Sequence, residues 1–362
     1  MQSVARLLSS LPFLLAVGSD PLAAESSDWQ WSVGGNFHYD WLRSDENDAL
    51  EQLGDVRRSR ISLALKAPGG FDAKLEFDAH ANNWTDAYLR WRDQGHSVRA
   101  GQFKQPMFLD ELTSDRYTMF LEQGMPGSFA LARRIGVEYA YATPTWRLGA
   151  SAYDGNLRGQ LSGAGMVARA VYTPWVEPGR VLHFAISAGS ENPDLNSARF
   201  SSRVEASGIG RTRLDTGTLS GVDRIRRSGV EALWINGAWT IQGEYLRSDL
   251  SRSTAADSGL DGWYVEASWF ASGDHTAYKD GAIDAPDIGP DGRALELAMR
   301  VSQLDLDAGA ARGGNSTNFS LGANWYLTRH VRLTANYVHV DGSRRTLAVE
   351  PDILEARLML TF

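Results

Sequence analysis

The side chains of this sequence best suited to bind a ligand are its arginines. Of 36 basic residues, 32 are Arg and only four are Lys: Lys66, Lys74, Lys104 and Lys279. A guanidinium can hold a carboxylate or a phosphate through two parallel hydrogen bonds, whereas an ammonium acts as a point charge. A GC-rich genome would produce the same excess of Arg. The composition therefore permits an anion site without establishing one.

Nine basic residues are candidates for one anion-binding cluster. Three of them are predicted on neighbouring strands, and four others lie in or beside a long irregular segment. Rings of charge at a constriction set the selectivity of a channel. The alternative is that these basic side chains form ion pairs with acidic residues on neighbouring strands and only line a water-filled interior, without binding a solute. The candidate anion-binding or constriction residues are Arg60, Lys74, Arg90, Arg92, Arg99, Lys104, Arg116, Arg133 and Arg134.

Catalytic, metal and nucleic-acid chemistry find little support. The seven His residues show no HExxH or other metal-ligand spacing, and the chain has no Cys for thiolate chemistry or disulfides. Gly313-Gly314 lacks the Lys-Ser/Thr of a phosphate-binding loop. The net charge of -8 excludes a globally basic nucleic-acid binder. We predict no catalytic residue, no metal, no cofactor and no nucleic-acid partner, and hence no enzyme.

The elements that must position the basic residues alternate with period two. In 318–327, apolar Phe319, Leu321, Ala323 and Trp325 alternate with polar or small residues. Residues i and i+2 of a strand point to the same face, so one face is apolar and the other polar. The pattern recurs in sixteen segments: 32–42, 57–66, 71–79, 84–92, 96–103, 134–142, 145–153, 163–173, 181–190, 227–236, 238–248, 261–271, 293–304, 315–327, 330–341 and 352–362.

Two all-β architectures are compatible with this alternation. A soluble sandwich hides the apolar faces, whereas a membrane barrel turns them to lipid and keeps polar groups in the lumen. Most segments have about the ten residues that a tilted transmembrane strand needs. Charged residues occupy nearly every polar face, and the chain ends on an alternating aromatic strand. The apolar faces begin or end in aromatics, as in the girdles of membrane barrels: Trp84, Trp91, Tyr141, Trp146, Tyr172, Trp239, Tyr245, Trp269, Trp325 and Tyr337. We therefore predict a transmembrane antiparallel β-barrel of about 16 strands.

The N-terminal residues are predicted to be a targeting signal rather than part of the folded domain. Arg6 precedes the short apolar run 7–17, and Leu22-Ala23-Ala24 offers a small-residue cleavage site. This is the pattern of a secretory signal peptide. We therefore predict a signal peptide over 1–24 and a single barrel domain over 25–362, located in the outer membrane after cleavage.

Two of the long connections carry specific expectations. The alternation fails for about 30 residues within 101–137, and structureless loops of that length are usually functional. There we expect a short helix over 110–123, capped by Thr113 or Ser114, in a third external loop that folds into the lumen. The connection 272–292 is also long. Either the strand count slips there, or the turn has a role of its own.

Several of these stretches resemble one family. Gly101-Gln102-Phe103-Lys104, Glu111-Leu112-Thr113-Ser114 and Arg133-Arg134-Ile135-Gly136-Val137 resemble the phosphate-selective porins O and P. So do 294–306, 318–327 and 332–341, and the resemblance spans nearly the whole mature chain. It implies a trimeric 16-stranded outer-membrane barrel that takes up phosphate or related anions through an Arg- and Lys-lined channel. It also implies a constricting third loop and a long periplasmic turn that can enter the lumen.

One departure weakens the anion prediction. The family often has Glu-Arg-Ser where this chain has Glu122-Gln123-Gly124, so a basic residue is missing inside the expected constriction. We predict a porin for passive diffusion of small solutes that favours phosphate or related anions, with the lipid bilayer, small anions and two further copies as partners. The alternatives are a non-selective or organic-solute porin and, third, a barrel enzyme or adhesin.

Overall fold

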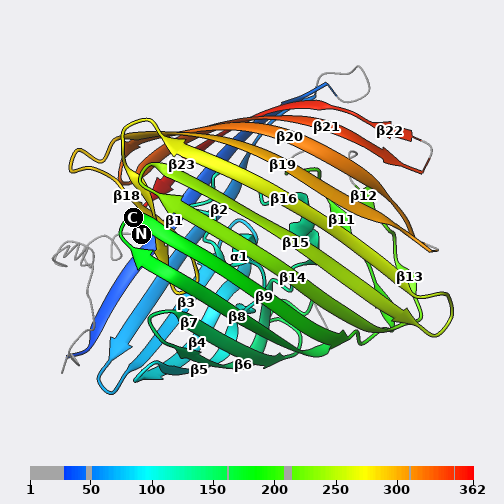
Figure 1. Cartoon of the computed structure of the whole chain (residues 1–362), viewed down its shortest axis with the longest axis horizontal. Coiled ribbons are helices and arrows are strands. Elements are labelled where there is room, and N and C mark those ends of the chain that lie inside the picture. The colour runs from blue at the N-terminus through cyan, green and yellow to red at the C-terminus, as the bar shows by residue number, and fades with distance from the viewer. Residues whose placement is uncertain (1–27, 46–50, 161–162, 208–213, 310, 346) are drawn as a thin grey trace, which may run out of the picture.

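The computed structural model describes residues 28–45, 51–160, 163–207, 214–309, 311–345 and 347–362. In this part of the chain, sixteen long strands form one antiparallel barrel (Figure 1). The predicted signal peptide over 1–24 lies outside the described residues. No helix in the described ranges is long and apolar enough to cross a membrane.

Every barrel strand coincides with a predicted segment, with ends that differ by up to six residues. The strands are β1 (Gln30–Ser44), β2 (Glu51–Ala67), β3 (Phe71–Asp78), β4 (Asn83–Asp93), β5 (His96–Lys104), β6 (Arg133–Ala142), β7 (Trp146–Tyr153), β8 (Ala164–Glu177), β9 (Arg180–Asn192), β14 (Val222–Asn236), β15 (Trp239–Arg252), β16 (Ser258–Phe270), β19 (Ala294–Ala308), β20 (Ala311–Thr328), β21 (Val331–Arg344) and β23 (Asp352–Thr361).

Each strand pairs with the next one in this order, and β1 pairs with β23 to close the barrel. The seam also uses the end of the chain, because the Gly35 N–H donates to the Phe362 carbonyl at 2.9 Å. Closure leaves no edge strand with unpaired backbone groups, which a bilayer would not tolerate.

The side chains alternate as a membrane barrel requires. In β19, Leu295, Leu297 and Met299 are exposed, whereas Glu296 and Arg300 are buried. Exposed apolar and buried polar side chains alternate in the same way around the wall. Eight of the ten predicted girdle aromatics are exposed: Trp84, Tyr141, Trp146, Tyr172, Trp239, Tyr245, Trp269 and Trp325. An apolar outer face and a charged inner face confirm the barrel and exclude the sandwich.

The irregular segment 105–132 contains only two short helices, α1 (Leu109–Leu112) and the 3-10 helix η2 (Met125–Phe129). The predicted helix over 110–123 is therefore wrong beyond Leu112. Thr113 is the C-cap residue of α1, and its hydroxyl donates to the Leu109 carbonyl at 3.0 Å. Residues 113–124 form turns and bends instead. Their carbonyls at Met119 and Leu121 accept from Asn324 and Arg357 of the barrel wall, which a continuous helix would not allow.

Further short strands lie in the long connections. The connection 272–292 contains the hairpin of β17 (His275–Lys279) and β18 (Ala282–Asp287), so the strand count does not slip there. Its Tyr278 hydroxyl lies 2.7 Å from His183 Nδ1, and Arg169 donates to the Gly281 carbonyl at 2.9 Å. Both wall residues are buried, so the hairpin packs against the inner face. The connection between β9 and β14 holds β10 (Ser197–Ala198), β11 (Ser201–Ser202), β12 (Leu214–Asp215) and β13 (Leu219–Ser220). The short strand β22 (Leu347–Val349) pairs antiparallel with the end of β21.

Candidate functional site: a polar cavity between segment 105–132 and the barrel wall

Segment 105–132 starts at β5 and contacts strands on the opposite side of the barrel. The Leu109 N–H donates to Glu244 of β15 at 2.8 Å, and the Met125 N–H donates to Ser302 of β19 at 3.1 Å. The Asn324 amide of β20 donates to the Met119 carbonyl at 2.9 Å. Its contacts therefore run along the buried, polar faces of these strands.

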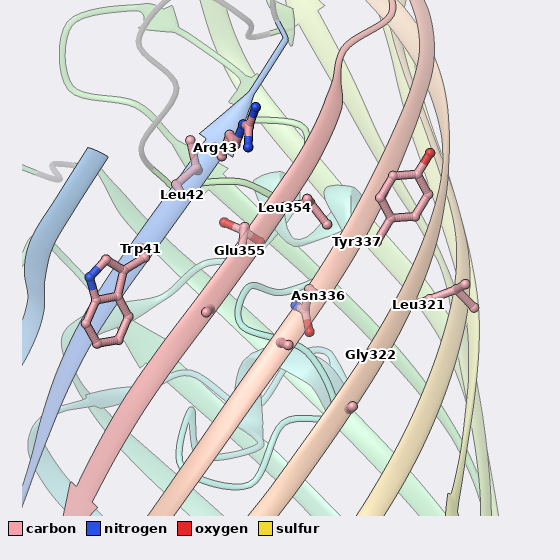
Figure 2. A pocket seen from close by; sticks show the side chains of 12 residues that line it. Trp41, Leu42, Arg43, Leu321, Gly322, Asn336, Tyr337, Leu354 and Glu355 are labelled. Atoms are coloured by element: carbon pink, nitrogen blue, oxygen red, sulfur yellow. The ribbon is translucent and has the colours of Figure 1, made fainter. Parts of the chain in front are cut away.

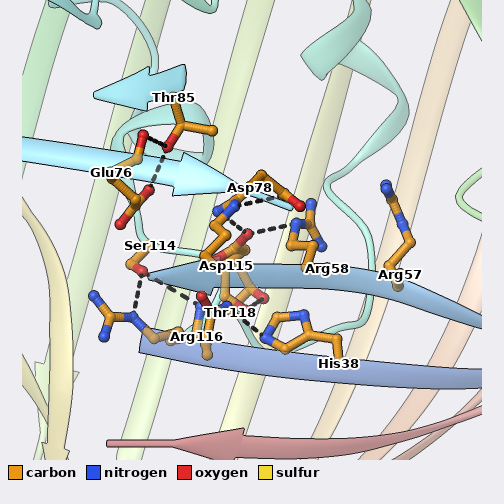
Figure 3. A network of polar contacts seen from close by, with 12 residues as sticks. His38, Arg57, Arg58, Glu76, Asp78, Thr85, Ser114, Asp115, Arg116 and Thr118 are labelled. Carbon is orange, nitrogen blue, oxygen red and sulfur yellow. Dashed lines mark hydrogen bonds and ion pairs between the residues drawn. The ribbon is translucent and has the colours of Figure 1, made fainter. Parts of the chain in front are cut away.

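A row of arginines holds the other edge of the segment. Arg57 pairs with Glu122 at 3.0 Å, and Arg58 and Arg60 each approach the Asp115 carboxylate to 2.7 Å. Figure 3 shows Arg58 of β2 beside Asp115. Forked contacts between guanidinium and carboxylate groups are both strong and directional. They fix the position of this edge against β2.

The two loop carboxyls are strongly perturbed. Burial opposes their ionisation, but the neighbouring guanidiniums outweigh it. Arg57 and Arg58 thereby lower the pKa of Glu122 to about 2. Arg58 and Arg60 hold the pKa of Asp115 well below its ordinary value. Both carboxylates are thus ionised at neutral pH.

A polar cavity of about 360 Å³ lies between the segment and β1 to β6. Among its described lining residues, seven are basic and five are acidic, an excess of two positive charges. The basic ones are Arg57, Arg58, Arg60, Lys74, Lys104, Arg116 and Arg133. The acidic ones are Glu76, Asp86, Glu111, Asp115 and Glu122.

Five of the nine predicted residues line this cavity: Arg60, Lys74, Lys104, Arg116 and Arg133. Lys74 and Arg133 share the carboxylate of Asp86, at 2.8 and 2.7 Å. Lys104 donates to the carbonyls of Glu111 and Thr113, so its ammonium fastens the turn after α1.

Arg116 and Lys104 are the two basic lining residues that make no ion pair with a described carboxylate, but the Lys104 ammonium is already held by two carbonyls. The Arg116 guanidinium donates to the Ser114 hydroxyl at 3.5 Å, a weak contact that Figure 3 shows. It also lies 5.7 Å from the centre of the Tyr117 ring. Among the cavity's basic groups, this one is best able to accept a new anionic partner.

The other four predicted residues are absent from the cavity lining. Arg90 and Arg92 both pair with Asp72, at 3.0 and 3.1 Å. Arg99 donates to Glu138 at 2.8 Å, and Arg134 pairs with Glu191 at 2.9 Å. These four arginines therefore form ion pairs with acidic residues on other strands, which was the alternative to an anion-binding cluster.

Sequence reasoning missed Arg57 and Arg58. Arg58 lies on the same strand face as Arg60, so alternation alone identifies it. Arg57 does not follow alternation, because β2 is irregular there. Val56 lies opposite Tyr39 and Arg58 lies opposite His38, so Arg57 is an extra residue in the ladder. Such a bulge re-aims side chains. The run Arg57-Arg58-Ser59-Arg60 was the available signal.

A second hollow lies on the outer wall. It is lined by the exposed side chains of Trp41, Leu321 and Leu354 and by three alanines in register, Ala323, Ala335 and Ala356 (Figure 2). Its apolar character matches the lipid-facing surface, so it is separate from the polar cavity. In the described ranges, no group of three or more His, Asp or Glu side chains is arranged to hold a metal ion.

A closed barrel with an apolar exterior and a charged interior is the architecture of a porin. Sequence comparison gives the family: residues 32–362 match the model of the phosphate-selective porins O and P, and the chain belongs to that family. It is accordingly a multi-pass β-barrel of the outer membrane.

Individual relatives are distant. Porin O of Pseudomonas aeruginosa is 22% identical over 384 residues, which cover 89% of this chain and 85% of that protein. The structure of OmpT of Vibrio cholerae gives a TM-score of 0.61 at 12% identity, over 94% of this chain and 99% of that one. An anion-selective porin from Comamonas acidovorans also gives 0.61, at 10% identity over 92% and 100% of the two chains. At these identities the structural similarity supports the fold alone.

Proposed function

We propose that this porin favours phosphate or related small anions, and that the polar cavity beside segment 105–132 is its selective constriction. The observation that carries this proposal is the Arg116 guanidinium, which enters the cavity without an ion-pair partner among the described residues. The excess of basic over acidic lining groups supports it. Rings of charge at a narrow point govern which ions pass.

Segment 105–132 is proposed to narrow the channel as an inward-folded third external loop. Its backbone hydrogen-bonds to Glu244, Ser302 and Asn324 on the far wall, while its acidic side chains reach β2. A solute crossing the barrel would then pass beside the ionic contacts of Asp115 and Glu122.

The ion pairs inside the cavity predict only a mild preference for anions. They also support a second candidate function. Arg57, Arg58 and Arg60 all contact carboxylates, so most of the positive charge is compensated. A wall of alternating cations and anions also suits organic solutes that carry both donors and acceptors. A non-selective or organic-solute porin is therefore the second candidate.

A homotrimer is also part of the proposal. A trimer form of OmpT is among the similar structures, at a TM-score of 0.59 and 12% identity. In this chain, β3 and β7 have eight residues each. That is fewer than the nine to eleven that a tilted strand needs to cross a bilayer. A neighbouring copy would cover this low part of the wall.

Reversal potentials in planar bilayers under a KCl gradient test the selectivity. The proposal predicts a potential of the sign that marks chloride as the more permeant ion. A potential that marks potassium as more permeant would overturn it. Liposome swelling separates the alternative, because rapid uptake of neutral sugars at the rate of small organic anions would favour a non-selective pore.

A further inference from the structure

One carboxylate holds the start of α1 against the wall. Glu244 Oε2 accepts the Leu109 N–H, and its Oε1 accepts the Asp110 N–H, both at 2.8 Å. The Tyr264 hydroxyl donates to the same Oε1 at 2.7 Å. Glu244 itself is 4% exposed. Buried backbone N–H groups are costly to leave without a partner, so these hydrogen bonds favour the docked position of the segment.

The residue before this contact is strained. Phe108 has a φ of +69°, in the left-handed region that a bulky residue rarely adopts. Its ring lies against Gly229 of β14, where an added Cβ would come within 2.6 Å of the ring. A strained backbone persists only where its surroundings over-determine it. The glycine and the carboxylate together hold the bend.

Other glycines of the same wall receive the segment in the same way. A Cβ on Gly262 would lie 3.1 Å from Pro126, and one on Gly322 would lie 3.1 Å from the Phe120 ring. Segment residues thus sit in three gaps left by inward glycines of β14, β16 and β20. The far edge of the segment is therefore fitted to its wall by shape as well as by hydrogen bonds.

The near edge of the segment faces the polar cavity, so the far-edge contacts set how wide that cavity is. We propose that Glu244 is a positioning residue, which pins segment 105–132 to β15 and thereby sets the conductance and steadiness of the channel. This inference rests on the proposed role of the segment as the constriction. Glu244 does not line the polar cavity.

The first test is Glu244→Gln, which keeps the side-chain volume but leaves one oxygen to accept two backbone donors. Leaving one buried backbone N–H without an acceptor lowers the ratio of docked to released segment by about tenfold. Single-channel recordings should then show brief conductance steps that the unmodified protein lacks. Gly229→Ala should act in the same direction, because its Cβ displaces Phe108.

Gly149→Ala is the matched control for the glycine variant. Gly149 is also a strand glycine, but an added Cβ would meet nothing nearer than 3.5 Å. Its recordings should match those of the unmodified protein. Heat-modifiable mobility on gels would show that each barrel is folded.

A tether keeps the inference testable if Gly229→Ala fails to fold. A Cβ on Gly124 would lie 3.4 Å from the Tyr264 Cβ, close to the 3.5–4.5 Å of disulfides. The chain has no cysteine of its own, so Gly124→Cys with Tyr264→Cys creates a single possible bridge. The oxidised protein should conduct steadily. Reduction should produce the brief steps, because the Tyr264 hydrogen bond to Glu244 is lost.

The inference would be overturned if the folded Glu244→Gln variant had the same conductance and noise as the unmodified protein, and if reduction of the tethered protein changed neither. The conductance steps can be measured whether the channel prefers anions or cations. If the unmodified protein proved cation-selective, that would contradict the proposed anion preference, and the Glu244 result could still be interpreted.

Discussion

Replacing Asp115 by Asn should make the channel more anion-selective. The substitution removes one negative charge from the cavity lining and releases Arg58 and Arg60 from a carboxylate that each approaches to 2.7 Å. The excess of positive charge in the lining therefore rises by one. The amide keeps the size of the side chain and one oxygen acceptor.

The size of the effect follows from the cavity. A volume of about 360 Å³ keeps a passing ion within about 6 Å of position 115, where a unit charge contributes about 0.7 kcal/mol in water. Screening at about 0.1 M salt reduces this to about 0.4 kcal/mol. Anions and cations are affected with opposite signs, so the anion-to-cation permeability ratio should rise about three- to fourfold.

Reversal potentials under a salt gradient measure that ratio directly. Asp249→Asn is the matched control, since Asp249 also pairs with an arginine, Arg247 at 2.8 Å, but is absent from the cavity lining. It should change the ratio little. An unchanged ratio for Asp115→Asn, or a shift toward cations, would refute the reasoning that this cavity is the selective point.

Three further predictions concern the cavity and the seam. Arg116→Gln should weaken the block of chloride current by phosphate several-fold, and an unchanged block constant would contradict its role. Asp115 and Glu122 have depressed pKa values, so their contribution to docking the segment is present above their ordinary values and is lost as the pH falls. Recordings should become unsteady from about pH 4.5 down to about 2; steadiness throughout would speak against it. Gly35→Val should destabilise the folded barrel by about 1–3 kcal/mol through overpacking. A Cβ there would meet Phe362 and the Arg60 carbonyl at 2.5 Å, and gel mobility after heating should show the loss.

The strands could be predicted because one physical rule governs all of them. Each must present apolar groups to lipid and polar groups to the interior, so residues such as Leu295 and Glu296 alternate along the whole wall. The segment between β5 and β6 follows no such period. Its turns are fixed by distant partners such as Glu244 and Asn324, which local sequence does not identify.

The site was predictable in part for a related reason. Arg60 and Lys74 lie on strands whose faces follow from alternation, and both reach the cavity. Arg57 does not follow alternation, because the bulge opposite His38 and Tyr39 re-aims it. Arg90 and Arg99 were correctly placed on polar faces, but their carboxylate partners depend on the register between strands. A one-residue change of register would give different partners.

The most direct test of the account is a phosphate titration of the single-channel chloride current in a planar bilayer. An anion that binds at Arg116 must compete with chloride for the same passage. The account predicts a saturable block by phosphate that weakens in Arg116→Gln. Chloride current that phosphate leaves unaltered at every concentration would contradict an anion-binding constriction, while the barrel fold would stand.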